Sequence, residues 1–402
     1  MGNGLESDSF LQLLELDSVL PSSGPIRTLL EEYVGETPAF KFMSHSLAKS
    51  ISDSLEYDAD APTIPLMEIE KYKDTQAVAR WLVEDFESLP WAYSLTFAFA
   101  NDFGKLFSQT AKEYQLGDTA RLVAPDAEFN EEFPLRKDGE PGARLKSRVL
   151  GLFSPEQWPA DSAAFQIKID GFVPHWGTCA SIERAVSLFK SLLGLGIALR
   201  LFKIGDNVDW YSPYFQPGFM IHQKISTSWQ IEREYKLDAS LSEMCKHLVL
   251  DDVGGMLDSD AKKAEWMLDR LRVIKSAFDL KQRASKIMLA SEWFLDSCGG
   301  AHELFSFVQT AVVLEILLGE KARSDLLGLG ELLGNRCAYL IAKSHKEREF
   351  ILKTFKEFYD VRSQIVHKGK PQLGLRERHL LYQLRQVCSR VISREMELLG
   401  QN

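Results

Sequence analysis

Arg362 and His367 are separated by four residues near the C-terminal end of the chain, and Lys368 and Lys370 follow directly. An arginine presents a planar fork of N–H donors that suits phosphate oxygens. A histidine can take up or release a proton near neutral pH without special tuning. The segment therefore combines a fixed cation, a proton-transfer group and a basic flank, which together suit the cleavage of a phosphodiester.

The spacing limits how these two side chains can cooperate. On one straight α-helix, five steps of about 100° leave Arg362 and His367 roughly 140° apart. Gly369 and Pro371 predict that the helix ends close to His367, and a chain that leaves the helix there could bring His367 toward Arg362. Alternatively, a second copy of the chain completes the site, because a two-fold dimer would line one cleft with the same patch from both copies. A purely structural interpretation is also open, with Arg362 pairing on the helix surface and His367 at the negative end of the helix dipole.

Four landmark segments occur in order through the last part of the chain: Ala290–Phe294, Ala311–Leu318, Asn335–Leu340 and Tyr359–His367. The last of them, a Tyr-Asp-x-Arg-Ser-x-Ile-Val-His string, is the most specific. With these segments the C-terminal part resembles the HEPN superfamily, and within it the Apea-like HEPN domains. The resemblance implies an all-α bundle that dimerises and acts as a metal-independent endoribonuclease through an arginine and a histidine at this spacing.

Carried over to this sequence, the resemblance gives His367 the role of general base or acid toward the RNA 2′-hydroxyl. Arg362 would hold the scissile phosphate and stabilise the developing charge. No metal or other cofactor is expected, because the nucleophile belongs to the substrate. The expected product is a 2′,3′-cyclic phosphate, formed in the presence of EDTA.

Further residues are expected to support the site or to bind RNA: Glu315, Arg336, Tyr359, Ser363, Lys368 and Lys370. Each has a structural alternative. Glu315 orients Arg362 or His367, or lies on a helix surface, and Arg336 reaches the cleft or extends from an amphipathic helix. Tyr359 favours packing over stacking on a base. Ser363 bonds a phosphate or its own helix backbone, and the two lysines meet RNA phosphates or form a solvated helix end.

Charge is divided unevenly along the 402 residues, whose net charge is −10. Residues 261–402 hold 24 Lys and Arg against 17 Asp and Glu, a net charge of +7 that leaves −17 for the remainder. A basic region can attract a polyanion. The acidic part could bind basic partners, screen the basic region or simply serve solubility. We therefore predict two domains: a mixed α+β regulatory or sensor region at 1–250, subdivided near 124–144, and an all-α HEPN bundle at 260–402.

Apolar spacing and turn residues predict the individual elements. In the first region we expect helices at 7–20, 26–34, 75–87 and 181–193, strands at 148–153, 164–169 and 198–204, and a loop at 124–144. In the second we expect one long helix at 261–297, capped by Ser259 or Asp260, and helices at 301–319, 325–342, 346–366 and 375–399.

Several classes of protein are not indicated by the sequence. No apolar run reaches the roughly 20 residues of a membrane span, and no signal peptide is expected. The five cysteines are odd in number and scattered, which indicates reduced thiols rather than disulfides. His175 and Cys179 have a metal-like separation but lack a second pair, so no metal site is expected.

Together these observations predict a cytoplasmic endoribonuclease of the HEPN type, a homodimer or higher homo-oligomer without a membrane partner. The family context implies a toxin or abortive-infection antiviral effector that cuts tRNA or other cellular RNA. The N-terminal region would regulate it and respond to a phage-derived activator or another regulatory partner. The alternative is a non-catalytic HEPN module for dimerisation or for binding RNA or protein in a defence complex.

Overall fold

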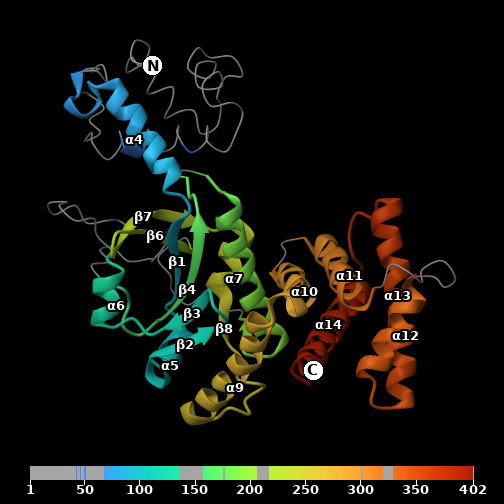
Figure 1. Cartoon of the computed structure of the whole chain (residues 1–402). Coiled ribbons are helices and arrows are strands. Elements are labelled where there is room, and N and C mark those ends of the chain that lie inside the picture. The colour runs from blue at the N-terminus through green and yellow to red at the C-terminus, as the bar shows by residue number, and fades with distance from the viewer. Residues whose placement is uncertain are drawn as a thin grey trace. The chain divides into compact units, whose positions relative to one another are not determined.

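A computed structural model describes residues 42, 46, 49–50, 68–135, 157–174, 177–205, 217–299, 302–319 and 329–401 (Figure 1). The chain divides into two compact units, one of residues 1–93 with 169–184 and one of residues 94–168 with 185–402. Neither limit coincides with the predicted boundary between 250 and 260, and the division into a regulatory region and a bundle stays a prediction. The helices expected at 7–20 and 26–34 and the strand expected at 148–153 lie outside the described residues.

The smaller unit contains the 3₁₀ turn η2 (Glu70–Tyr72) and α4 (Thr75–Glu87), which confirms the helix predicted at 75–87. The Asp74 carboxylate caps α4 by accepting hydrogen bonds from the backbone N–H groups of Gln76 and Ala77, both at 3.0 Å. The buried ring of Phe42 lies 5.0–5.5 Å from the rings of Phe86, Trp91 and Phe172. This edge-to-face aromatic cluster forms the described core of the unit.

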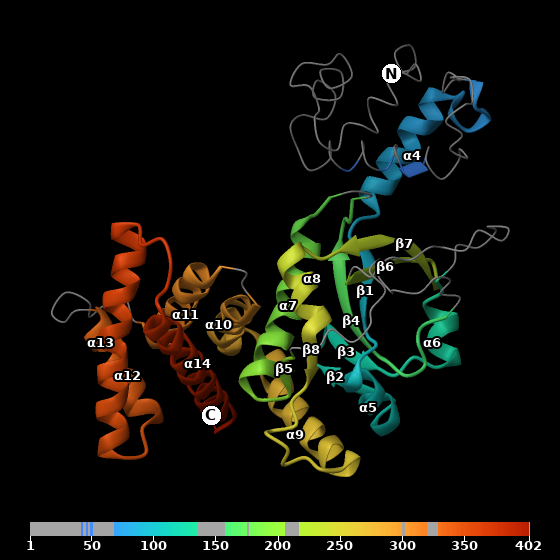
Figure 2. The same cartoon turned by 180° about the vertical axis from the view of Figure 1, so that it is seen from behind.

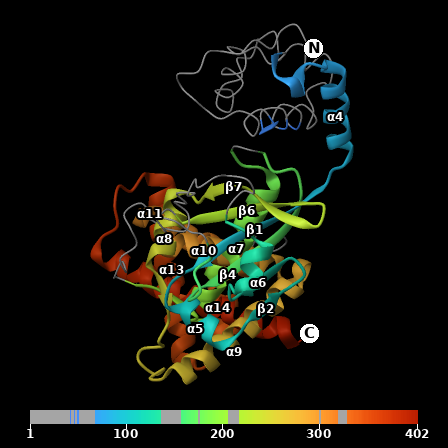
Figure 3. The ribbon, with the colours of Figure 1, turned by 90° about the vertical axis from the view of Figure 1, so that its left-hand side faces the viewer.

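A six-stranded sheet dominates the first half of the larger unit, which begins at Ser94 within β1. Its strand order is β2 (Glu113–Leu116), β3 (Ala120–Val123), β4 (Ala163–Gly171), β1 (Trp91–Phe99), β6 (Gly218–Ile225) and β7 (Ser228–Lys236), as Figure 3 shows from β7 inward. The pairs β2–β3, β3–β4 and β6–β7 are antiparallel. A second, two-stranded antiparallel sheet joins β5 (Phe202–Ile204) to β8 (Leu248–Leu250) and lies beside α7 (Ala180–Ala198), as Figure 2 shows.

Both faces of the central strands are buried. On one face the rings of Phe97, Phe165 and Phe219 lie 4.5–5.9 Å from the ring of Phe189 on α7 (Ala180–Ala198). Because strand residues alternate between faces, the residues between these aromatics point the other way. This explains why β1 has an almost continuous buried run instead of an alternating pattern.

The opposite face carries a satisfied polar network. The Gln166 side chain donates to the hydroxyls of Ser94 and Thr96 at 3.3 and 3.2 Å and accepts from Arg121 Nε at 2.9 Å. Gln166, Ser94 and Thr96 are almost completely buried, so these hydrogen bonds offset the cost of removing their polar groups from water.

The short helices α5 (Asp102–Thr110), α6 (Ala127–Glu132) and α8 (Ala239–His247) complete this half. The strand predicted at 164–169 and the helix predicted at 181–193 are confirmed in β4 and α7. The strand predicted at 198–204 is wrong in its first part, because α7 continues to Ala198 and β5 begins at Phe202. Helix α6 lies inside the segment expected to be a loop.

The described residues from 260 onward form six helices, which make the C-terminal part helical, as predicted: α9 (Asp260–Asp279), α10 (Lys281–Gly299), α11 (Glu303–Leu318), α12 (Leu329–Ile341), α13 (His345–Lys368) and α14 (Leu375–Gln401). Ser259 caps α9 by accepting from the Lys262 N–H, as expected. Helices α10, α11 and α14 pack on one another, and α12 packs on α13 and α14.

The single long helix predicted at 261–297 is wrong, because the chain turns between α9 and α10 at Lys281, whose φ is +24°. No glycine or proline signals this break. Helix α9 packs on α5, β2 and α14, whereas α10 packs on α8, α11 and α14. One straight helix cannot follow both sets of partners, so tertiary packing overrides the helical pattern at this point.

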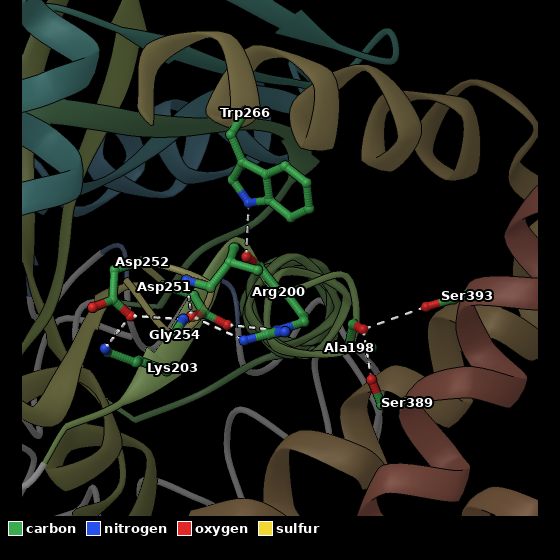
Figure 4. Close-up of polar contacts among 10 residues, drawn as sticks. Ala198, Arg200, Lys203, Asp251, Asp252, Gly254, Trp266, Ser389 and Ser393 are labelled. Carbon is green, nitrogen blue, oxygen red and sulfur yellow. Dashed lines mark hydrogen bonds and ion pairs between the residues drawn. The ribbon is translucent and has the colours of Figure 1, made fainter. Parts of the chain in front are cut away.

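The C-terminal end of α7 joins the sheet region to the last helix (Figure 4). The Ala198 carbonyl accepts from the hydroxyls of Ser389 and Ser393 on α14 at 2.7 and 3.4 Å. The Trp266 indole of α9 donates to the Arg200 carbonyl at 3.0 Å. Arg200 Nε in turn donates to the buried carboxylate of Asp251 at 3.0 Å. The serine and tryptophan contacts satisfy carbonyls at and just beyond the end of α7 that would otherwise lack partners.

Candidate functional site

Helix α13 sets the direction of every candidate side chain on it. Ser344 caps its first turn by accepting from the Glu347 N–H. Helix α13 ends at Gly369, whose φ of 63° and ψ of 40° are left-handed, the conformation that favours glycine after a helix. Its buried positions are Ile351, Thr354, Phe355, Phe358 and Val361. Through this stripe one face of α13 packs against the rest of the helical region, and the residues roughly opposite the stripe face outward.

Arg362 lies at the border of the buried stripe and pairs within the same chain. Its Nη2 is 3.2 Å from Oε1 of Glu315 on α11, and each of the two side chains is about a quarter exposed. The Tyr359 hydroxyl donates to the same Glu315 oxygen at 3.4 Å, and the guanidinium carbon lies 6.0 Å from the Tyr359 ring. The structure thus brings three of the predicted residues together.

The charges in this cluster are partly removed from water. Burial, followed by the negative charge of Glu315, raises the pKa of Tyr359 well above its usual value, while Arg362 opposes the shift. Tyr359 is therefore a neutral hydrogen-bond donor here and not a proton-transfer group. The Arg362 Nε atom is buried without a hydrogen-bond partner among the described residues. The guanidinium therefore has a donor that its contact with Glu315 does not use.

His367 lies in the last turn of α13 and faces away from Arg362. Its side chain is exposed, as are those of Ser363 and Lys368. Within the part of the chain that the structure describes, the imidazole makes no hydrogen bond and no ion pair. The unbroken helix from 345 to 368 keeps the two side chains roughly 140° apart, so one copy of the chain does not bring them to a common face.

Two other predicted residues have structural partners. Lys370 Nζ lies 3.0 Å from Glu377 Oε1, and the other Glu377 oxygen accepts from the Gly374 N–H at the start of α14. Burial alone would raise the pKa of Glu377, but the Gly374 N–H and the Lys370 ammonium outweigh it and lower that pKa. Arg336 Nη1 donates to the Leu318 carbonyl at 2.6 Å and so caps the C-terminal end of α11.

The sequence analysis did not single out Phe350 on α13 or Tyr382 on α14, two aromatic residues that the structure exposes. A helical wheel of α13 could have identified Phe350. The apolar spacing of Ile351, Phe355 and Phe358 forms one stripe, and Phe350 falls outside it. Tyr382 gives no comparable signal, because its neighbours in sequence are a mixture of apolar and polar residues.

The described residues contain no group of three or more His, Cys, Asp or Glu side chains placed to hold a metal ion. None of the helices described has the length and apolar content needed to cross a membrane. Comparisons of the chain with protein-family models, with curated proteins and with solved structures found no match.

Proposed function

We propose that this chain is a metal-independent endoribonuclease of the HEPN type, with Arg362 and His367 as its catalytic residues. The observation that carries the proposal is the arrangement of α13. One helix end presents an accessible imidazole, and the guanidinium five residues earlier has an unpartnered buried donor among the described residues. Arg362 and His367 stand at the positions that the sequence resemblance gives to the catalytic residues. The C-terminal region is helical, as a bundle of this type requires.

A second copy of the chain completes the site in this proposal. Large apolar side chains are exposed near the end of α13: Val366 on α13, Phe305 on α11 and Leu375 on α14, the last 84% exposed. The ion pairs Arg378–Glu303 and Lys370–Glu377 hold the starts of α11 and α14 to this end of the helical region. Covering such a surface favours association, and a two-fold axis would bring the two helix ends together.

The chemistry needs only groups of the chain and the substrate. His367 takes the proton from an RNA 2′-hydroxyl as its oxygen attacks the adjacent phosphorus. The bond to the 5′-oxygen breaks, and that oxygen receives a proton from the histidine of the second copy or from water. Arg362 stabilises the negative charge on the non-bridging oxygens. The products are a 2′,3′-cyclic phosphate and a 5′-hydroxyl.

The proposed biological role is that of a cytoplasmic toxin or antiviral effector that cuts tRNA or other cellular RNA. The acidic first part of the chain would regulate it, responding to a phage-derived activator or another partner. The support is the charge division, −17 against +7, together with the six-stranded sheet that the chain has in addition to its helical part.

The test is cleavage of total cellular RNA in EDTA by the wild-type chain, by His367→Ala and by Arg362→Ala, with the product ends mapped. We expect cyclic-phosphate ends from the wild type and a loss of roughly 100-fold or more in each variant. Lys286→Ala, an exposed residue on α10, is the matched control and should cleave normally. Cleavage that persists in both site variants would place the chemistry elsewhere.

One observation favours a second candidate, a non-catalytic module that dimerises or binds RNA or protein. Glu315 already neutralises Arg362 within a single chain, so a phosphate must compete with a carboxylate for the guanidinium. In this case no form of the protein cleaves RNA, even with a lysate from infected cells added as a source of activator.

A further inference from the structure

The outward surface of α13 and α14 carries two exposed aromatic rings. Phe350 is 50% exposed and Tyr382 is 60% exposed. The ion pairs Glu347–Arg390 at 2.7 Å and Glu357–Arg376 at 2.9 Å show that the two helices run antiparallel and side by side. Phe350 lies between the two glutamates on α13, and Tyr382 lies between the two arginines on α14. The rings are therefore at similar heights along this helix pair.

Three lysines surround the ring on α13. Lys346 and Lys353 lie four residues before and three residues after Phe350, so both are its neighbours on the helix surface, and Lys356 follows one turn later. All three are exposed, and none forms an ion pair with another described residue. Two carboxylates share this face: Asp360, and Glu349, which lies 3.6 Å from His345 Nδ1. Neither carboxylate is within ion-pair distance of the lysines.

This combination of side chains indicates the kind of partner. Exposed rings flanked by unpaired lysines differ from a typical protein interface, whose buried centre is depleted in lysine. They match a single-stranded nucleic acid, in which each unpaired base offers a flat face for stacking and each phosphate a negative charge. A duplex would keep its base faces stacked internally and could use only the lysines.

We propose that the surface formed by Lys346, Phe350, Lys353, Lys356 and Tyr382 binds single-stranded RNA and delivers it to His367. The proposal rests on the proposed nuclease function and names its substrate class as unpaired RNA. His367 lies 17 residues beyond Phe350, which is about 25 Å along α13, and on the same side of the helix as Lys356, from which it is only about 20° away around the axis. A bound strand of several nucleotides would thus extend from the rings to the catalytic end.

The experiment measures binding by the full chain carrying His367→Ala, so that bound RNA is not cut. The probes are a fluorescein-labelled single-stranded RNA of about 15 nucleotides, within the range of such binding sites, and a duplex of the same sequence. Tyr382→Ala is compared with Tyr339→Ala, because Tyr339 on α12 is 86% exposed and lies outside the proposed surface. Replacement of Lys346, Lys353 and Lys356 by Gln is compared with the same replacement at three exposed lysines elsewhere, Lys105, Lys112 and Lys286.

We expect Tyr382→Ala to weaken binding of the single strand by about fivefold or more, with Tyr339→Ala unchanged. The patch lysine variant should lower the salt slope of log K by about 2, and the control triple should not. Equal effects of the two tyrosine variants would overturn the proposal. So would a change from dimer to monomer in Tyr382→Ala, measured by light scattering, because a second copy would then cover the ring.

Failure of the RNA-binding surface can be distinguished from failure of the proposed nuclease function. If the wild-type chain cleaves RNA in EDTA while the patch variants bind and cleave normally, the surface is not the substrate track and the nuclease assignment stands. If the wild-type chain neither binds nor cleaves RNA, both proposals fail together.

Discussion

The sheet interior around His222 and the open end of α13 around His367 use the same residue type in opposite ways. His222 is completely buried, its Nε2 donates to the Pro134 carbonyl at 2.9 Å, and the rings of Phe133 and Trp158 lie 5.5 and 6.3 Å away. Its Nδ1 has no partner among the described residues. His367 is exposed on the last turn of a helix. Proton transfer to a substrate requires an accessible histidine such as His367. Burial instead makes His222 part of the packed interior, where it resists protonation.

The largest expected effect is on the stability of the sheet region in acid. Burial lowers the pKa of His222 from its ordinary value of 6.5 to about 4, although the Pro134 carbonyl opposes the shift. As the pH falls from 6.5, the unfolded chain binds a proton at this residue and the native chain does not, so stability is lost until the pH reaches about 4. The full loss amounts to about 3 kcal/mol.

Urea denaturation at several pH values, compared between the wild type and His222→Gln, isolates this contribution. The glutamine can donate to the Pro134 carbonyl and does not titrate, so its stability should fall less between pH 6.5 and 4. The control is His345→Gln, because the His345 side chain is 84% exposed. An identical pH profile for the wild type and His222→Gln would mean that the buried imidazole is protonated in the native state.

The two regions also differ in how far the sequence determines them. Helices such as α4, α13 and α14 follow from apolar spacing and from end residues such as Ser344 and Gly369 on α13, because these signals are local. Strands β1, β6 and β7 were not predicted. In β1 both faces are buried, by the Phe189 ring and by the Gln166 network, and the alternation that marks a half-buried strand is lost. The break at Lys281 was also missed, since it reflects packing partners distant in sequence.

At the candidate site, helix geometry alone gave the roughly 140° divergence of Arg362 and His367. The sequence could name Glu315 as a residue that orients one of them, but not which one. That choice depends on where α11 packs against α13, and the structure gives the contact to Arg362. Exposure was predictable only in part, since a helical wheel of α13 separates Phe350 from the stripe that contains Phe355, whereas no local pattern marks Tyr382 on α14 as exposed.

An intermediate effect is expected for the Arg362–Glu315 pair, which is neither fully buried nor fully open. A double-mutant cycle with Glu315→Gln and Arg362→Met, measured by urea denaturation, should give a coupling free energy of about 1 kcal/mol. The gain is modest because each side chain keeps about a quarter of its exposure and water screens the charges.

The matched control is the exposed pair Lys262–Asp258, 57% and 66% exposed, measured in the same way with Lys262→Gln and Asp258→Asn. Its coupling should stay below about 0.5 kcal/mol. If the Arg362–Glu315 coupling were no larger than this control, the carboxylate would not fix the guanidinium, and its position relative to a phosphate would have to come from the second copy.

The smallest expected effect completes the comparison of the two histidines. His367→Gln removes an exposed side chain without a described partner and leaves the buried stripe of α13 intact, so the free energy of unfolding should change by no more than about 0.5 kcal/mol at pH 7.5. Thermal and urea denaturation of this variant measure that change beside its RNA cleavage. Lost cleavage with unchanged stability separates a catalytic histidine from a structural one. A destabilisation of more than about 1 kcal/mol would instead show that His367 is covered in solution and serves the assembly.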